Sequence, residues 1–129
     1  MLFNIYNDGK HNNTIRLLTK YHRDNQSNIG YNASGNVHTI WVGDFNRHHP
    51  YWDDLGDDRL FTREATTAAE LLIEAVAKNG LELALPWGIL THCHNATKRW
   101  SRLDQVFVLE HSIGMVTACN TLPEHRGIY

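Results

Sequence analysis

A carboxylate and a carboxamide follow an apolar segment in the first half of the chain. Asp44 and Asn46 come just after Ile40, Trp41 and Val42, which favour a strand. Side chains two positions apart at the end of a strand point to the same side. A carboxylate can orient or deprotonate a water, and an amide can stabilise a developing phosphate charge or help to hold a divalent cation. The pair predicts phosphodiester hydrolysis, although a turn without chemical function also fits these two residues.

The elements that must position this pair can be read along the chain. A strand is expected over Leu2–Tyr6, and a helix beyond it that Asn13 or Thr14 caps. Asn, Gly and Ser then predict a loop over residues 24–36, before a strand over 38–42. The first helix should bury a stripe of residues that recur every three positions, namely Ile15, Leu18 and Tyr21.

The second half predicts the clearest helix and three more strands. Thr62 can cap the helix and Gly80 can end it in a left-handed conformation. Its apolar stripe consists of Ala65, Ala69, Leu72 and Val76. Strands are expected over residues 81–85, 103–109 and 114–119. Alternating strands and helices followed by successive strands predict a layered α/β fold with a mixed sheet flanked by helices.

Composition bounds the kind of protein. The 129 residues fit one domain, and the formal net charge of -2 argues against nucleic-acid binding by bulk charge alone. A local basic group at Lys98, Arg99 and Arg102 could still meet phosphates, although a solvated loop fits it equally well. No apolar run approaches the length of a membrane helix and no signal peptide opens the chain, so we expect an intracellular protein without membrane contact.

A longer motif surrounds the first pair. Residues 43–52 read GDFNRHHPYW, which resembles the GDFNxHHPxW signature of the endonuclease/exonuclease/phosphatase superfamily, in particular its non-LTR retrotransposon branch. The resemblance implies a DNase I-like layered sandwich and a nuclease that cleaves DNA with Mg²⁺ or Mn²⁺. It also implies a nuclear location. Asp44 and Asn46 are then both catalytic residues and metal ligands, and His48 contacts the substrate.

Two further segments resemble motifs of the same family. Asn4–Asn7 matches its NxY motif, in which Tyr6 and Asn7 approach the scissile phosphate; a tyrosine packed in the core is the alternative for Tyr6. Residues 101–108 resemble its SRIDxVFV strand, which makes Asp104 the aspartate that orients a catalytic histidine. Within the family, Arg102 and Thr91 correspond to residues on the substrate side.

Two groups of the family's site have no counterpart in this sequence. One is a metal-binding glutamate ahead of the NxY motif, and the other is a terminal Ser/Thr-Asp-His motif. Glu124 and His125 are considered as a degenerate acidic pair for the second group. We therefore interpret residues 1–129 as a partial domain, and we expect very weak or no cleavage because groups that act as a unit fail together.

Other interpretations remain open from the sequence. A zinc site could be built from Cys93, His94 and His48, although neighbouring strand residues point to opposite faces. The fold could also persist as a non-catalytic remnant or interaction module, or act on small phosphoesters. A partial sandwich leaves sheet edges exposed, which predicts self-association.

Overall fold

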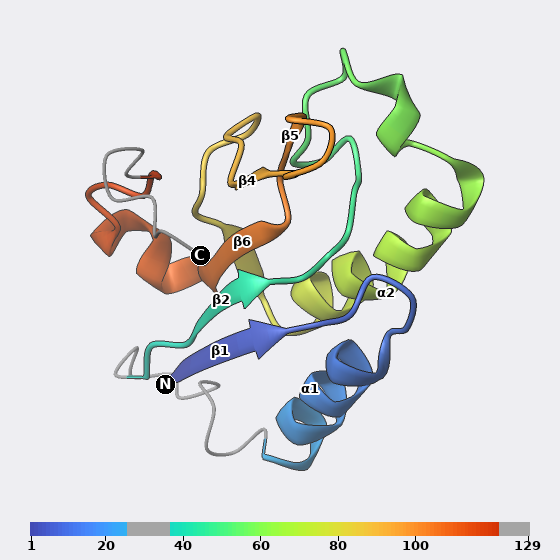
Figure 1. The fold of residues 1–129 in the computed structure, drawn as a ribbon. Coiled ribbons are helices and arrows are strands. Elements are labelled where there is room, and N and C mark those ends of the chain that lie inside the picture. Colours follow the sequence, from blue (N-terminus) through green and yellow to red (C-terminus); the bar gives the residue numbers. More distant parts are fainter. Residues whose placement is uncertain (26–36, 122–129) are drawn as a thin grey trace.

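The computed structural model describes residues 1–25 and 37–121, which build a four-stranded mixed sheet (Figure 1). Its strand order is β1-β2-β6-β3. β2 runs parallel to β1 and antiparallel to β6, and β6 also runs antiparallel to β3. The mixed α/β fold expected from the sequence is thus confirmed. The bounds are Leu2–Tyr6 for β1, Ile40–Asp44 for β2, Leu81–Leu83 for β3 and Asp104–Leu109 for β6.

Two helices, α1 (Asn13–Asp24) and α2 (Arg63–Lys78), lie together on one side of the sheet (Figure 1). The strands turn alternate residues toward them, among which Trp41 and Phe107 are wholly buried and stand opposite each other. The helices contribute Ile15, Leu18, Ala69 and Leu72 to the same cluster. One apolar core therefore joins the sheet to both helices.

The ends of α2 match their sequence signals. Thr62 precedes the helix, and its hydroxyl oxygen accepts a hydrogen bond from the amide of Ala65 at 3.1 Å. Gly80 has a φ of 60°, a left-handed conformation that suits a helix stop. Thr62 and Gly80 were both identified correctly, because such end signals act within a few residues.

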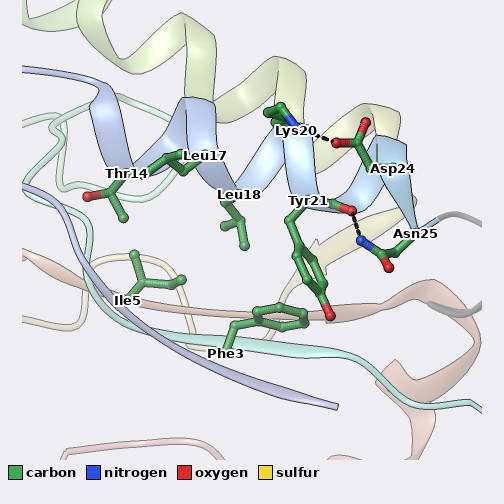
Figure 2. Close-up of a pocket in the computed structure, with 9 residues that line it drawn as sticks. All are labelled: Phe3, Ile5, Thr14, Leu17, Leu18, Lys20, Tyr21, Asp24 and Asn25. Carbon is green, nitrogen blue, oxygen red and sulfur yellow. Dashed lines mark hydrogen bonds and ion pairs between the residues drawn. The ribbon is translucent and has the colours of Figure 1, made fainter.

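The start and stripe of α1 differ from expectation. The N-cap residue is Asn12 rather than Asn13 or Thr14, and its side chain makes no capping hydrogen bond. The third buried position is His22 rather than Tyr21, because a four-residue step from Leu18 keeps closer to the helical repeat. Tyr21 is 46% exposed and packs edge-on against Phe3 in the groove between α1 and β1 (Figure 2).

The strand expected over residues 114–119 is wrong. After Leu109 the chain enters a 3-10 helix, η2 (Glu110–Met115), as the amide of Glu110 donates to the oxygen of Gly80. Met115 and Val116 are exposed and pair with no strand among the described residues. Three short elements were not expected: η1 (Asp58–Leu60), β4 (His92–Cys93) and β5 (Trp100–Ser101), of which the last two pair as a hairpin.

The sheet turns its second face away from the helices. Leu2 and Tyr6 on that face are 69% and 70% exposed. β1 and β3 form the two edges of the sheet. In the described parts of the chain no helix is long and apolar enough to cross a membrane. Most of the loop expected over residues 24–36 lies outside the described residues.

Candidate active site

Three of the predicted catalytic residues lie in one row across the sheet. Asp44 stands opposite Tyr6 of β1 and opposite Asp104 of β6. Side chains at paired positions share a face, so all three project from the face that the helices leave open. The row forms at one end of the sheet, because Asp44 and Tyr6 end their strands and Asp104 begins its own. The structure thus brings Tyr6, Asp44 and Asp104 together.

The carboxyl group of Asp44 is short of partners. Its Oδ1 is buried and has no hydrogen-bond partner among the described residues. Burial raises the pKa of Asp44, and the charge of Asp104 raises it further; a hydrogen bond from the backbone amide of Asn46 and the charge of His92 act in the opposite direction. Two carboxyl groups that share a half-buried site favour the binding of a proton or a cation, which reduces their mutual repulsion.

Gly43, the residue that precedes Asp44, allows the backbones of β1 and β2 to approach each other closely. Its φ is 134°, and a Cβ built there would lie 2.2 Å from the backbone oxygen of Ile5. Beyond it, the amide of Asn7 donates to the oxygen of Asp44, and the amide of Phe45 donates to that of Leu103, both at 2.9 Å. The backbone of Asp44 is therefore held from both sides.

The side chain of Asn46 is tied to Asn7, whereas its backbone amide is bonded to the carboxyl group of Asp44. Asn46 adopts a left-handed φ of 50°, and its Nδ2 donates to the backbone oxygen of Asn7 at 3.1 Å. Asn7 is 1% exposed and donates its own amide to the oxygens of Asp8 and Phe45. Its Oδ1 is buried without a partner among the described residues. The two asparagines hold the ends of β1 and β2 together.

Thr91 fixes the start of β6. Its hydroxyl oxygen accepts hydrogen bonds from the amides of Leu103 and Asp104, each at 3.1 Å. This contact gives Thr91 a structural part in placing the carboxyl group of Asp104. Direct contact between Thr91 and a substrate stays a prediction.

The side chain of Arg102, which the resemblance places on the substrate side, makes its hydrogen bonds within the chain. It is wholly buried and donates to Gln105 Oε1 at 2.8 Å, and to the backbone oxygens of Trp52, Leu85 and Pro86. Burial lowers its pKa to about 10, and the charge of Asp53 opposes this shift. A guanidinium fork can bridge several carbonyls at once, so Arg102 fastens these segments together.

The loop after β2 is held by packing and by hydrogen bonds. Trp52 is 1% exposed and its Nε1 donates to the oxygen of Arg47 at 2.9 Å. His48 Nδ1 lies 3.4 Å from an oxygen of the buried Asp53, which also accepts from the amide of His49 at 2.9 Å. A substrate contact of His48 stays a prediction.

The zinc hypothesis is not supported. Across residues 1–25 and 37–121, no group of three or more His, Cys, Asp or Glu side chains is arranged to hold a metal ion. His48, Cys93 and His94 all belong to those residues. Glu124 and His125, considered as a degenerate acidic pair, lie outside the described residues.

Sequence reasoning missed Arg47 and Asp53. Arg47 is 3% exposed and Asp53 is 2% exposed, although both are charged. Each lies in a loop, where no periodicity separates a buried charge from a solvated one. The only available signal was their place beside the GDFN motif, with Arg47 directly after it and Asp53 directly after Trp52.

The comparison with protein families decides the identity. The profile of the endonuclease-reverse transcriptase family matches residues 1–129. The chain belongs to that family. A comparison with curated proteins finds no match. The family assignment therefore comes from the whole length of the chain rather than from the GDFN motif alone.

Solved structures resemble this endonuclease-reverse transcriptase family chain at low sequence identity. One is the endonuclease domain of TRAS1, a telomere-specific non-LTR retrotransposon, with a TM-score of 0.55 and 17% identity over 88% of this chain and 46% of that chain. Another is the mannosyl-6-phosphatase Bt3783 of Bacteroides thetaiotaomicron, with a TM-score of 0.44 and 16% identity over 84% and 36%. The TRAS1 match shows a shared fold, and the chain spans less than half the length of that domain.

Proposed function

We propose that this chain carries part of a metal-dependent active site that hydrolyses phosphodiester bonds in DNA. One observation carries the proposal: Asp44 lies between Tyr6 and Asp104, with a buried carboxylate oxygen that lacks a partner among the described residues. Burying an acceptor without a partner costs free energy, so a site of this kind persists where a ligand completes it.

Each side chain has a distinct part in the proposed reaction. Asp44 aligns the attacking water. Asn46 and Tyr6 contact the phosphate, together with Asn7. Asp104 holds a histidine, as the family resemblance implies.

The residues at this site fit a hard divalent cation, Mg²⁺ or Mn²⁺. Mg²⁺ is usually bound by one or two carboxylates together with water and substrate phosphate. The described residues supply two neighbouring carboxylates, Asp44 and Asp104, and Asn46 lies close to the first. When bound, such an ion would polarise the phosphoryl oxygens. We propose Asp44 and Asn46 as its ligands in this chain.

The proposed turnover of these 129 residues by themselves is very low or absent. The family's glutamate and terminal Asp-His pair have no counterpart in the sequence, and catalytic groups that act as a unit lose most of their effect when one is missing. Binding of the cation is therefore a sharper test than cleavage.

The experiment measures Mn²⁺ binding to the purified chain by electron paramagnetic resonance, alongside Mg²⁺- or Mn²⁺-dependent nicking of supercoiled plasmid. We expect Mn²⁺ to bind and Asp44→Ala to weaken binding at least about tenfold. The matched control is Asp54→Ala, which removes an exposed carboxyl group from the loop that follows β2. Nicking that survives Asp44→Ala belongs to a contaminant, and equal Mn²⁺ binding by the wild type and Asp44→Ala overturns the proposal.

The same samples separate the other candidate functions. A non-catalytic remnant or interaction module binds no Mn²⁺ at Asp44. A small-molecule phosphoesterase hydrolyses p-nitrophenyl phosphate faster than it nicks plasmid. DNA as substrate would place the protein in the nucleus, the location that the retrotransposon resemblance implies.

We also propose weak self-association through the exposed edge of the sheet. β1 is an edge strand, and Leu2 at its start is 69% exposed. Unpaired strand edges favour pairing between chains, and a lysine placed on an edge opposes it. Sedimentation velocity should show association that Leu2→Lys reduces and that Met115→Lys, at a residue 66% exposed in η2, leaves unchanged. Equal effects of the two substitutions would exclude the edge as the interface.

A further inference from the structure

Arg47 is a buried cation between the loops that follow β1 and β2. Its side chain is 3% exposed, and burial lowers its pKa while the charge of Asp8 raises it. Nothing in the proposed reaction uses this residue. A charge buried beside a candidate active site requires a structural explanation, because desolvation is costly unless hydrogen bonds replace the lost water.

The guanidinium group reaches the connection between β1 and α1. Nη1 donates to the oxygen of Asp8 at 3.2 Å, and Nη2 donates to the oxygen of His11. Asn12 Oδ1 accepts from Nε at 2.9 Å and from Nη2 at 2.5 Å. Asn12 in turn donates to the oxygen of Ala68 in α2 at 3.2 Å, which anchors the connection.

The same guanidinium also holds the residue that precedes it. Nη1 donates to the backbone oxygen of Asn46 at 2.6 Å. Asn46 donates its side-chain amide to the oxygen of Asn7, immediately before Asp8. Arg47 thus closes a ring of hydrogen bonds that includes Asn7 and Asn46. A lysine cannot close this ring, because it lacks the planar fork of donors.

We propose that Arg47 is a positioning residue, which sets the side-chain amide of Asn46 and the backbone of Asn7 through the connection between β1 and α1. The consequence for catalysis rests on the proposed function, in which both asparagines contact the phosphate. The positional claim itself does not depend on activity.

Nuclear magnetic resonance tests the positional claim on the full ¹⁵N-labelled chain. The probe is hydrogen exchange of the Asn46 side-chain amide, assigned by its disappearance in Asn46→Asp. In Arg47→Lys we expect this exchange to accelerate about tenfold, because the restraint that one hydrogen bond provides is lost. The backbone amides of β2 should keep their protection. An unchanged Asn46 amide in a folded Arg47→Lys protein overturns the proposal.

Two further variants guard against a merely structural effect. Asn12→Ala removes the acceptor of two Arg47 hydrogen bonds without touching Asn46, so it should accelerate Asn46 exchange in the same direction. Arg102→Lys is the matched control, because it also weakens a buried guanidinium, but one that donates to none of Asn7, Asn46 and Asn12. It reaches Arg47 only indirectly, through Trp52, whose Nε1 donates to the backbone oxygen of Arg47. If Arg102→Lys accelerates Asn46 exchange as much as Arg47→Lys does, general loosening explains the result and the proposal falls.

Steady-state cleavage separates this inference from the proposed function. If the wild type nicks plasmid, Arg47→Lys should lower kcat at least about tenfold with little change in KM, because positioning acts on the transition state. A second outcome is that the Asn46 side-chain amide loses its protection in Arg47→Lys while the wild type neither cleaves DNA nor binds Mn²⁺. That combination supports Arg47 as the positioning residue and rejects the proposed function. If Arg47→Lys cleaves with the same kcat as the wild type, Arg47 does not contribute to catalysis.

Discussion

Asp44 and Asp104 occupy directly opposite positions in the antiparallel pair of β2 and β6. Both carboxyl groups belong to the open face of the sheet, beyond the point where the helices cover it. Like charges at opposed positions destabilise a sheet. Burial of the Asp44 carboxyl group adds a desolvation cost to this repulsion. This pair is a local cost to the fold and the feature on which the proposed site depends.

Gly43 should tolerate no side chain. Gly43→Ala places a Cβ 2.2 Å from the oxygen of Ile5 at a φ of 134°, and we expect a loss of about 3 kcal/mol in the free energy of unfolding. Gly114→Ala is the matched control, because a Cβ there meets nothing within 4 Å. Urea denaturation measures both. Similar stabilities of the two variants would show that β1 and β2 do not approach as described.

His22 should make the protein less stable below neutral pH. Its Nε2 accepts from Trp41 Nε1 at 2.9 Å, which requires a neutral ring, and burial lowers the pKa of His22. The unfolded chain therefore binds the proton more readily than the folded one. Stability from this group is complete above the ordinary histidine pKa near 6.5 and declines as the pH falls toward the lowered value. Urea denaturation at pH 8 and pH 5 measures the difference.

The control for that measurement is His22→Gln, which retains an acceptor for Trp41 but does not titrate. We expect a smaller fall in stability between pH 8 and pH 5 in this variant than in the wild type. The same fall in both proteins would assign the pH dependence to other groups.

Arg102 should contribute to stability. Arg102→Met removes the hydrogen bonds to the oxygens of Trp52, Leu85 and Pro86, and we expect a loss of about 3 kcal/mol in the free energy of unfolding. Arg16→Met, on the exposed side of α1, should change the stability by less than about 0.5 kcal/mol. Thermal and urea unfolding provide the comparison. A stable Arg102→Met protein would return this residue to the list of candidate substrate contacts.

The sequence predicted those parts of the fold that depend on short-range signals. Thr62 and Gly80 bound α2 through contacts within a few residues, and the apolar strands follow from alternation. The strand expected over residues 114–119 failed because a pattern of apolar residues does not say whether a partner strand is present. His22 was overlooked because its residue type alone does not show whether a histidine on a helix is buried or exposed.

The candidate site shows the same limit. Asp44 and Asp104 were each identified from their motifs, but their opposition requires the register of β2 and β6, which sequence spacing does not specify. Arg102 was assigned to a substrate because its motif and its charge suggest a surface. Its burial depends on carbonyls of Leu85 and Pro86, which lie in another segment of the chain.

The most direct test of the account is the titration of the Asp44 side-chain carboxyl group, followed by carbon-13 nuclear magnetic resonance. We predict a pKa above the ordinary aspartate value near 3.8, lowered by Asp104→Asn and, in the wild type, lowered also by Mg²⁺, because each change removes or offsets the opposing negative charge. An Asp44 pKa at the ordinary aspartate value near 3.8, unaffected by both Asp104→Asn and Mg²⁺, would contradict the shared site.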